Sequence, residues 1–248
     1  LILLVNPHIN NFIAVLDGAL ITNMRTGAQT AVALKYLLGL KDGERRPIHL
    51  GIYGAGMQGH MQTRAISTLF DIEELRIYDV SRAALERFRE DMQSAIPGRI
   101  ILCDDPKDAA QGDAVICVTQ SKEGFLKEEW LSPETIVFPM GSYQECEDDV
   151  LLHADKIVVD HVEQTLHRGA LSMLAAEGKI TRESITCTIG ELVAGRAELH
   201  REPAQRIVCL PIGTGAMDIG CASVVYQRAL EQKRGQFFDF GVSSATEW

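Results

Sequence analysis

The chain has 248 residues, of which 46% are hydrophobic and 23% are charged. This composition is typical of a globular protein with one or two domains and a sizeable core. Its formal net charge of −10 argues against nucleic acid or an anionic membrane as a partner, since both favour a basic surface. No apolar run approaches the length of a membrane span. We therefore expect a cytoplasmic protein that binds neither nucleic acid nor membrane.

Cysteine and histidine spacings give no sign of a disulfide framework or a metal centre. The six cysteines are scattered without a CxxC pair, which favours reduced thiols. His161 and His167 are six residues apart, and on a helix that spacing places them well away from one another. No metal site is predicted.

The N-terminal segment reads as a hairpin. Within residues 1–16 the apolar runs LILLV and FIAVL flank the polar turn NPHINN. The chain is strand-like from Leu1 and does not begin with Met, so we expect a further segment upstream.

A helix is predicted from Thr22 to Leu38, where the apolar residues follow a helical period and Gly39 provides a stop. The charged stretch 41–47, which carries Gly and Pro, is the best linker candidate in the chain. One apolar face of the helix is formed by Ala31, Ala33, Leu34, Leu37 and Leu38.

Strands alternate with helices over the middle of the chain. This alternation predicts βαβ units with right-handed crossovers, and so a doubly wound α/β fold with a parallel sheet. The predicted strands are 48–53, 75–79, 99–103, 113–118, 135–139 and 156–160, and the helices are 57–69, 81–93 and a short one near 105–110.

Toward the C-terminus, residues 161–196 have mostly helical character and 206–211 (RIVCLP) resemble another strand. A long helix is predicted at 215–232. Its candidate core residues are Ile219, Val224, Val225 and Leu230.

The stretch GIYGAGMQGH suggests a dinucleotide-binding turn. Gly54 allows a tight turn, Gly56 lets the backbone approach a pyrophosphate, and Gly59 permits close packing of the following helix. The free N–H groups at the start of that helix, at Met57 and Gln58, would face the phosphates. A lone glycine motif is weak evidence, because glycines also collect at ordinary turns.

Asp79 strengthens this interpretation. It ends the next predicted strand, LRIYDV, where an acidic residue would hold the adenosine ribose. Its charge would repel a 2′-phosphate, so NAD is favoured over NADP. Arg82 keeps NADP open, although a solvated arginine at a helix start is the simpler reading.

Six segments together resemble the ornithine cyclodeaminase/mu-crystallin family of NAD(P)-dependent oxidoreductases. They follow the family order over nearly the whole chain, and they are residues 16–37, 51–66, 114–137, 154–171, 190–196 and 211–230. The resemblance implies a Rossmann-type domain at 43–211 and a smaller α+β substrate and dimerisation domain made of 1–42 and 212–248. It also implies a homodimer, and a missing upstream part that carries a Lys and a Glu facing the substrate.

The resemblance also implies roles for individual residues. Arg25, in TNMRT, matches the arginine that binds the substrate carboxylate, and a guanidinium suits that task. Thr119 and Ser121 match residues on the nicotinamide side, although a plain polar loop is an even alternative for Ser121.

The chain departs from the family at FPMGSYQECEDDV. Cyclising members carry an Asp two residues after the glycine that matches Gly141, and this chain has Tyr143 there. Tyr143 is therefore the candidate catalytic residue at this position. Its hydroxyl can donate a hydrogen bond, but tyrosine is a poor general base at neutral pH. Glu145, Asp148 or Asp149 could supply a carboxylate from a shifted loop, or could simply form a solvated helix start.

We therefore expect an NAD-dependent enzyme acting at the α-carbon of an L-amino acid, with an amino or imino acid as its small-molecule partner. The resemblance implies an ornithine cyclodeaminase-like reaction, which converts L-ornithine to L-proline and ammonia and is a deaminating lyase reaction. A ketimine reductase or an alanine dehydrogenase-like enzyme with net NAD(P)H turnover is the alternative. A non-catalytic binding protein resembling mu-crystallin is the alternative of another class.

Overall fold

The computed structural model describes residues 1–238, which form two compact units. One unit combines residues 1–21 with the chain from Gly215 onward, and the other spans Thr22–Thr214. The larger unit thus begins at residue 22, whereas the sequence predicted the nucleotide domain from residue 43. The roles expected of the two domains stay predictions.

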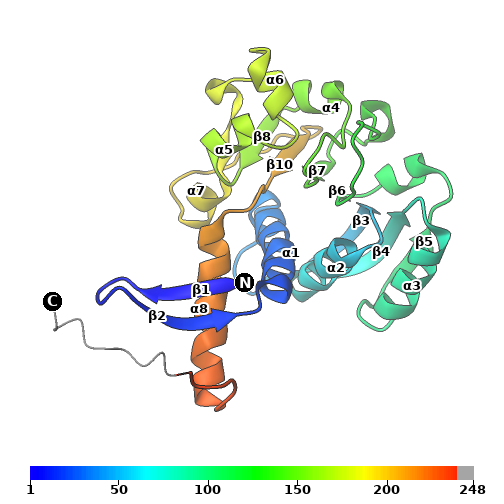
Figure 1. The fold of residues 1–248 in the computed structure, drawn as a ribbon. Coiled ribbons are helices and arrows are strands. Elements are labelled where there is room, and N and C mark those ends of the chain that lie inside the picture. Colours follow the sequence, from blue (N-terminus) through cyan, green and yellow to red (C-terminus); the bar gives the residue numbers. More distant parts are fainter. Residues whose placement is uncertain (239–248) are drawn as a thin grey trace. The chain divides into compact units, whose positions relative to one another are not determined.

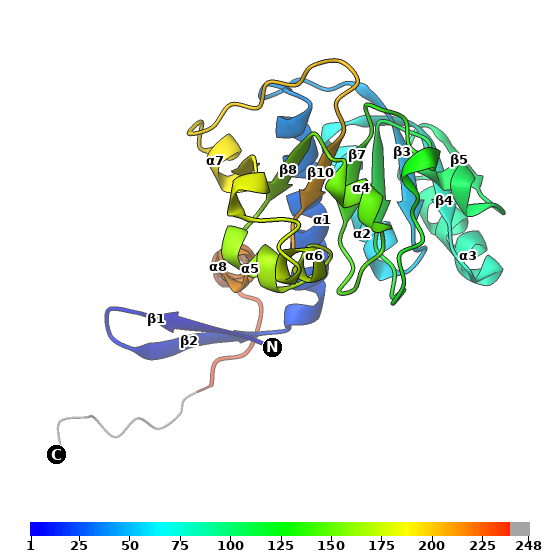
Figure 2. The ribbon, with the colours of Figure 1, turned by 90° about the horizontal axis from the view of Figure 1, so that it is seen from above.

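The larger unit is built on eight parallel strands in the order β5-β4-β3-β6-β7-β10-β8-β9 (Figures 1 and 2). The order reverses at β3, which has β4 on one side and β6 on the other. This confirms the predicted doubly wound sheet. The strands are β3 (Pro47–Tyr53), β4 (Asp71–Tyr78), β5 (Arg99–Leu102), β6 (Ala114–Cys117), β7 (Ile136–Pro139), β8 (Lys156–Val159), β9 (Cys187–Thr188) and β10 (Ile207–Leu210).

Helices cover both faces of the sheet, and each face has its own hydrophobic core. Ile136 and Phe138 of β7 belong to one core and Val137 to the other, as the two-residue period of a strand requires. Figure 1 shows α1, α2 and α3 on one side and α4, α5 and α6 on the other. The helices are α1 (Gly18–Leu37), α2 (Met57–Leu69), α3 (Arg82–Met92), α4 (Asp148–Leu152), α5 (Val162–His167), α6 (Ser172–Ala176) and α7 (Ile189–Val193).

Helix α1 packs on the sheet of the larger unit through the face that the sequence predicts. Ala31, Ala33, Leu34 and Leu37 are buried in the same core as β3 and α2. Beyond the helix, Gly39 has φ +67, a conformation that glycine adopts without strain. The helix begins at Gly18, four residues before the predicted start.

Three predicted segments take shorter or different forms. The helix expected near 105–110 is a 3-10 helix, η1 (Pro106–Ala110), with Asp105 as its N-cap. Residues 161–196 hold α5, α6 and α7, a 3-10 turn η3 (Arg182–Ser184) and the two-residue strand β9. Between β6 and β7 lies a further 3-10 turn, η2 (Glu128–Trp130).

The smaller unit consists of the predicted hairpin and the predicted C-terminal helix. Strand β1 (Ile2–Asn6) pairs antiparallel with β2 (Asn11–Leu16), and α8 spans Gly215–Glu231. Its small core contains Ile2, Leu4 and Ala222. No helix within residues 1–238 is long and apolar enough to cross a membrane.

The predicted core residues of α8 are not buried. The helix contacts its own unit through Ala222 and Tyr226, whereas the four larger apolar side chains that were predicted to be in the core stay exposed. Apolar residues at helical spacing predict burial, but they do not identify the partner that provides it. The exposed fractions are 44% for Ile219, 55% for Val224, 44% for Val225 and 42% for Leu230.

Candidate functional site

The turn between β3 and α2 has close contacts at two of its three glycines. Gly54 has φ +107, and a β-carbon there would lie 2.6 Å from the carbonyl oxygen of Val118. A β-carbon at Gly59 would overlap the carbonyl oxygen of Gly54. At Gly56 a β-carbon would meet no atom within 4 Å, so the N-terminus of α2 faces open space. This space suits a phosphate that approaches the backbone.

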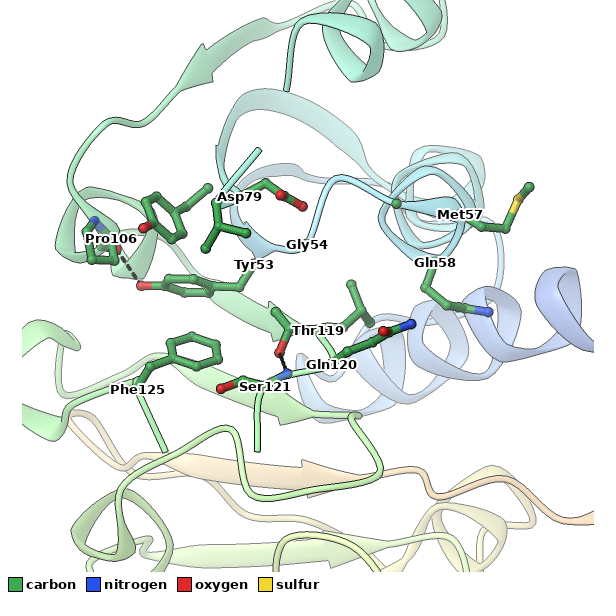
Figure 3. Close-up of a pocket in the computed structure, with 14 residues that line it drawn as sticks. Tyr53, Gly54, Met57, Gln58, Asp79, Pro106, Thr119, Gln120, Ser121 and Phe125 are labelled. Atoms are coloured by element: carbon green, nitrogen blue, oxygen red, sulfur yellow. Dashed lines mark hydrogen bonds between the residues drawn. The ribbon is translucent and has the colours of Figure 1, made fainter. Parts of the chain in front are cut away.

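A pocket of ≈ 760 Å³ lies beside this turn (Figure 3). It is formed by the loops that follow β3, β4 and β6, at the carboxyl ends of strands where the sheet order reverses. Ligands of open α/β sheets bind at this location. Of the residues predicted to bind a cofactor, all except Gly59 line the pocket: Gly54, Gly56, Met57, Gln58, Asp79, Thr119 and Ser121.

Asp79 is held by two backbone N–H groups. Ala55 donates to one carboxylate oxygen at 2.8 Å and Ser81 donates to the other at 2.8 Å. Each oxygen keeps a further lone pair that could accept from a ribose hydroxyl. Arg82 donates to Asp104 at 2.9 Å and to Glu86 at 3.3 Å, and it does not line the pocket. This pairing favours an unphosphorylated ribose.

Aromatic side chains, which the sequence interpretation missed, form one wall of the pocket. The ring centroid of Tyr53 lies 5.0 Å from that of Phe125 and 6.1 Å from that of Tyr78. The Tyr53 hydroxyl donates to the carbonyl of Pro106 at 2.6 Å, as Figure 3 shows. Burial raises the pKa of Tyr53 far above its usual range, so the phenol stays neutral. Tyr53 and Tyr78 end neighbouring strands, a position that could have revealed them.

The Thr119 loop is fixed from behind by Glu145. The backbone N–H of Thr119 donates to Glu145 Oε1 at 2.6 Å and its hydroxyl donates to the same oxygen at 2.7 Å. Gly141 N–H donates to Oε2 at 2.6 Å. Glu145 is 0% exposed and does not line the pocket. The idea that this residue offers a free carboxylate to a substrate is therefore wrong.

Two further polar residues of the pocket, Ser121 and Gln58, are also anchored. Ser121 N–H donates to Thr119 Oγ1 at 3.2 Å, and the Ser121 hydroxyl donates to the carbonyl of Glu123 at 2.8 Å. Gln58 Nε2 donates to Asn23 Oδ1 at 2.9 Å, and Figure 3 shows Gln58 directed toward the neighbouring helix.

Arg25 lies outside this pocket but at the same edge of the sheet. A β-carbon at Gly213, after β10, would overlap the Arg25 guanidinium, so the two residues are in close contact. Gly213 N–H donates to Asp160 Oδ2 at 2.7 Å, and Gln29 Nε2 donates to the same oxygen at 3.0 Å. Asp160, just after β8, thus holds the backbone against which the guanidinium lies.

Tyr143 is 52% exposed and does not line the pocket. Asp148 and Asp149 lie in the first turn of α4, where acidic side chains favour the helix N-terminus. Within residues 1–238, no group of three or more His, Cys, Asp and Glu side chains is arranged to hold a metal ion.

A parallel sheet whose order reverses at β3, with a glycine turn and an acidic strand end beside the pocket, defines a Rossmann-type nucleotide-binding protein. The chain belongs to the ornithine cyclodeaminase/mu-crystallin family, whose model matches residues 1–233.

Two curated relatives are dehydrogenases. Alanine dehydrogenase of Archaeoglobus fulgidus is 30% identical over 244 residues, which are 97% of this chain and 73% of that protein. N-((2S)-2-amino-2-carboxyethyl)-L-glutamate dehydrogenase of Staphylococcus aureus is 31% identical over 240 residues, which are 94% of this chain and 69% of that protein.

Solved structures of similar proteins contain the nicotinamide cofactor. Thermococcus litoralis Delta(1)-pyrroline-2-carboxylate reductase, in complex with NADH and L-proline, superposes with a TM-score of 0.85 at 27% identity, covering 95% of this chain and 73% of that one. An archaeal alanine dehydrogenase dimer with bound NAD superposes with a TM-score of 0.84 at 30% identity. The match covers 96% of this chain and 73% of that one.

Proposed function

We propose that this chain is an NAD(H)-dependent oxidoreductase that moves a hydride at the α-carbon of an L-amino or imino acid. The observation that carries the proposal is the placement of Arg25 at the carboxyl edge of the nucleotide-binding sheet. The pocket opens beyond β6, and Gly213 follows β10, two strands away in the order β6-β7-β10. Two strand spacings are roughly 10 Å. A carboxylate held by Arg25 would therefore lie close to one end of a cofactor in the pocket.

The residues of the pocket suit NAD. The open space beside Gly56 would take the pyrophosphate at the start of α2, and Asp79 would accept from the adenosine ribose. Thr119 and Ser121 would then face the nicotinamide end. When bound, NAD supplies the hydride acceptor, and NADH the donor, that the protein side chains lack.

Arg25 would orient the substrate. A guanidinium offers two parallel N–H donors to a carboxylate, which fixes the substrate rotationally as well as by charge. Because Gly213 has no side chain, its backbone lies directly against the guanidinium and sets its position. This arrangement supports an α-amino or α-imino acid as the substrate class.

Within that class we favour net cofactor turnover, as in an amino-acid dehydrogenase or an imine reductase. Cyclodeamination needs a group to handle the substrate amine and the leaving ammonia, and Tyr143 stands at the position of the family's Asp. The carboxylate of Glu145 is already occupied by Thr119 and Gly141. Ornithine cyclodeamination is the second candidate. It is favoured by the likeness to a probable ornithine cyclodeaminase from Bordetella pertussis, which superposes with a TM-score of 0.76 at 26% identity.

We also propose that the chain forms a homodimer in which α8 contributes to the interface. The four large apolar side chains of α8 are each at least 42% exposed. A second copy of the chain would bury them, and an archaeal relative has been solved as a dimer.

Parallel assays of NADH absorbance and ammonia separate the candidate activities. L-alanine, L-proline and L-ornithine are each supplied with NAD, and in the reverse direction the corresponding imino acids are supplied with NADH, or the oxo acids with NADH and ammonium. Lasting absorbance change with one substrate supports the proposed turnover. Ammonia release without lasting absorbance change supports the cyclodeaminase instead. NADH binding without either signal supports a binding protein.

A further inference from the structure

Glu145 is a buried acid that joins two loops of the sheet edge. Its Oε1 accepts from Thr119 in the loop after β6, and its Oε2 accepts from Gly141 in the loop after β7. The side chain is 0% exposed. Burial raises the pKa of Glu145, and the hydrogen bonds from Thr119 and Gly141 counter this effect only in part.

The backbone of Glu145 holds a third part of the pocket. Its carbonyl accepts from Phe125 N–H at 3.0 Å and from Leu126 N–H at 3.0 Å. Phe125 lines the pocket, and Thr119 Oγ1 accepts in turn from Ser121 N–H at 3.2 Å. One residue thus anchors Thr119, Ser121 and Phe125, which Figure 3 shows on the side of the pocket opposite Asp79.

The backbone at Gly141 lies directly against the Glu145 carboxylate. A β-carbon at Gly141 would lie 2.6 Å from Glu145 Cδ, so only glycine leaves room for the carboxylate against the backbone. The donors approach both oxygens. A glutamine side chain accepts through one oxygen only, and its amide nitrogen would face an N–H or O–H donor.

We infer that Glu145 is a positioning residue that sets the nicotinamide-side wall of the cofactor pocket by holding Thr119, Ser121 and Phe125 in place. The inference rests on the proposed function, because it requires that NAD(H) occupies this pocket with Asp79 at the adenosine end. Glu145 itself touches neither cofactor nor substrate, since it lies behind the pocket wall.

The test compares Glu145→Gln with the matched control Glu147→Gln. Glu147 is exposed, two residues away, and no side-chain hydrogen bond caps α4 from it. Binding of NADH is followed by its fluorescence, and binding of ADP-ribose, which lacks nicotinamide, by calorimetry. Because Glu145 holds the pocket wall on the nicotinamide side, we expect Glu145→Gln to weaken NADH binding about tenfold or more. This loss corresponds to roughly one charged hydrogen bond. ADP-ribose affinity stays within about twofold, and Glu147→Gln changes neither affinity.

Thr119→Val tests the same contact from the other side. It removes the hydroxyl that donates to Glu145, and it should weaken NADH binding more than ADP-ribose binding. Combined with Glu145→Gln, it should cost less than the sum of the two single changes, because the two side chains share one hydrogen bond.

Two results overturn the inference. One is a cooperatively folded Glu145→Gln protein that binds NADH as tightly as the wild type. The other is an equal loss for NADH and ADP-ribose, which indicates a purely structural role. If Glu145→Gln does not fold, unchanged NADH binding by Thr119→Val overturns it. A wild-type chain that binds ADP-ribose and NADH equally poorly contradicts the proposed function itself.

Discussion

Asp79 ends β4 with both of its carboxylate oxygens held by backbone N–H groups of Ala55 and Ser81. This position makes the carboxylate a fixed negative charge beside the pocket. A fixed charge there would select an adenosine ribose without a 2′-phosphate. We therefore propose that the Asp79 carboxylate governs the choice between NAD and NADP.

Replacement of Asp79 by Asn tests this role. The neutral amide can accept through one oxygen only, so we expect NADH affinity to fall about tenfold while NADPH affinity falls less. Glu90→Gln, which neutralises an exposed acid on α3, is the control. Titration with both reduced nucleotides measures the ratio. An unchanged preference for NADH would show that another residue reads the ribose.

Tyr53 contributes to stability through one buried hydrogen bond. Tyr53→Phe leaves the carbonyl of Pro106 without this donor, which should lower the free energy of unfolding by about 1–2 kcal/mol. Urea denaturation measures the change, and Tyr78→Phe provides an aromatic control. Equal stability of both variants would mean that water replaces the phenol.

Among the elements, the glycine segment at the start of α2 allows effects on stability and effects on cofactor binding to be measured separately. Gly59→Ala would drive its β-carbon into the Gly54 carbonyl, and we expect a loss of roughly 1–3 kcal/mol of stability. Gly56→Ala has room for its methyl group and should keep the wild-type Tm, while the methyl occupies the space of the pyrophosphate and weakens NADH binding. Thermal unfolding and NADH titration distinguish the two variants. The reverse pattern would contradict the assigned geometry.

His153, which follows the last residue of α4, forms an ion pair whose contribution to stability depends on pH. His153 Nδ1 lies 2.7 Å from Glu128 Oε2, and this carboxylate raises the pKa of His153. Glu128 also accepts from Arg206 at 2.7 Å, and its pKa is lowered, first by His153 and then by Arg206. A raised histidine pKa stabilises the fold below the ordinary value near 6.5, and the gain is lost as pH rises through the higher folded-state pKa.

His153→Asn removes this contribution. The difference in Tm between wild type and variant should be larger at acidic than at alkaline pH. His200→Asn, on an almost fully exposed histidine, is the control for the loss of an imidazole. A constant difference for His153→Asn would mean that the ion pair does not form in solution.

The elements of the nucleotide-binding sheet could be predicted because each carries a local signal. Strand β3 and helix α2 are marked by an apolar run and by glycines, and α2 spans the predicted residues 57–69. The contacts of Glu145 could not be predicted, because a cluster of acids before a helix resembles a solvated N-terminus. Only the register of the loops after β6 and β7, which depends on distant contacts, brings that carboxylate under Thr119.

For the whole molecule, helix α8 shows what a hydrophobic pattern in the sequence cannot predict. The apolar residues of α8 were expected in a core, and the contacts within the smaller unit leave them exposed. The apolar residue types predict burial, but they cannot say whether the same chain or another copy covers them. The fold class, by contrast, follows from the order of elements along the chain.

The proposed homodimer can be tested by placing a charged side chain among the exposed apolar residues of α8. Val225→Glu places a carboxylate in the proposed interface and should shift the chain from dimer to monomer, because the buried charge would have no partner. Gln227→Glu adds the same group at another exposed position of α8 and should leave the mass unchanged. Light scattering after gel filtration gives the mass. A wild-type monomer would contradict the proposed assembly.

Hydride transfer from the α-carbon is the central claim, and isotope transfer measures it most directly. The chain is incubated with NAD and amino acids deuterated at Cα, beginning with alanine, proline and ornithine, and the nicotinamide ring is analysed by mass spectrometry. We predict that deuterium from one of these substrates appears on the reduced nicotinamide, and that Arg25→Ala abolishes the transfer. Tight NADH binding with no deuterium on the nicotinamide from any α-amino acid would contradict the claim.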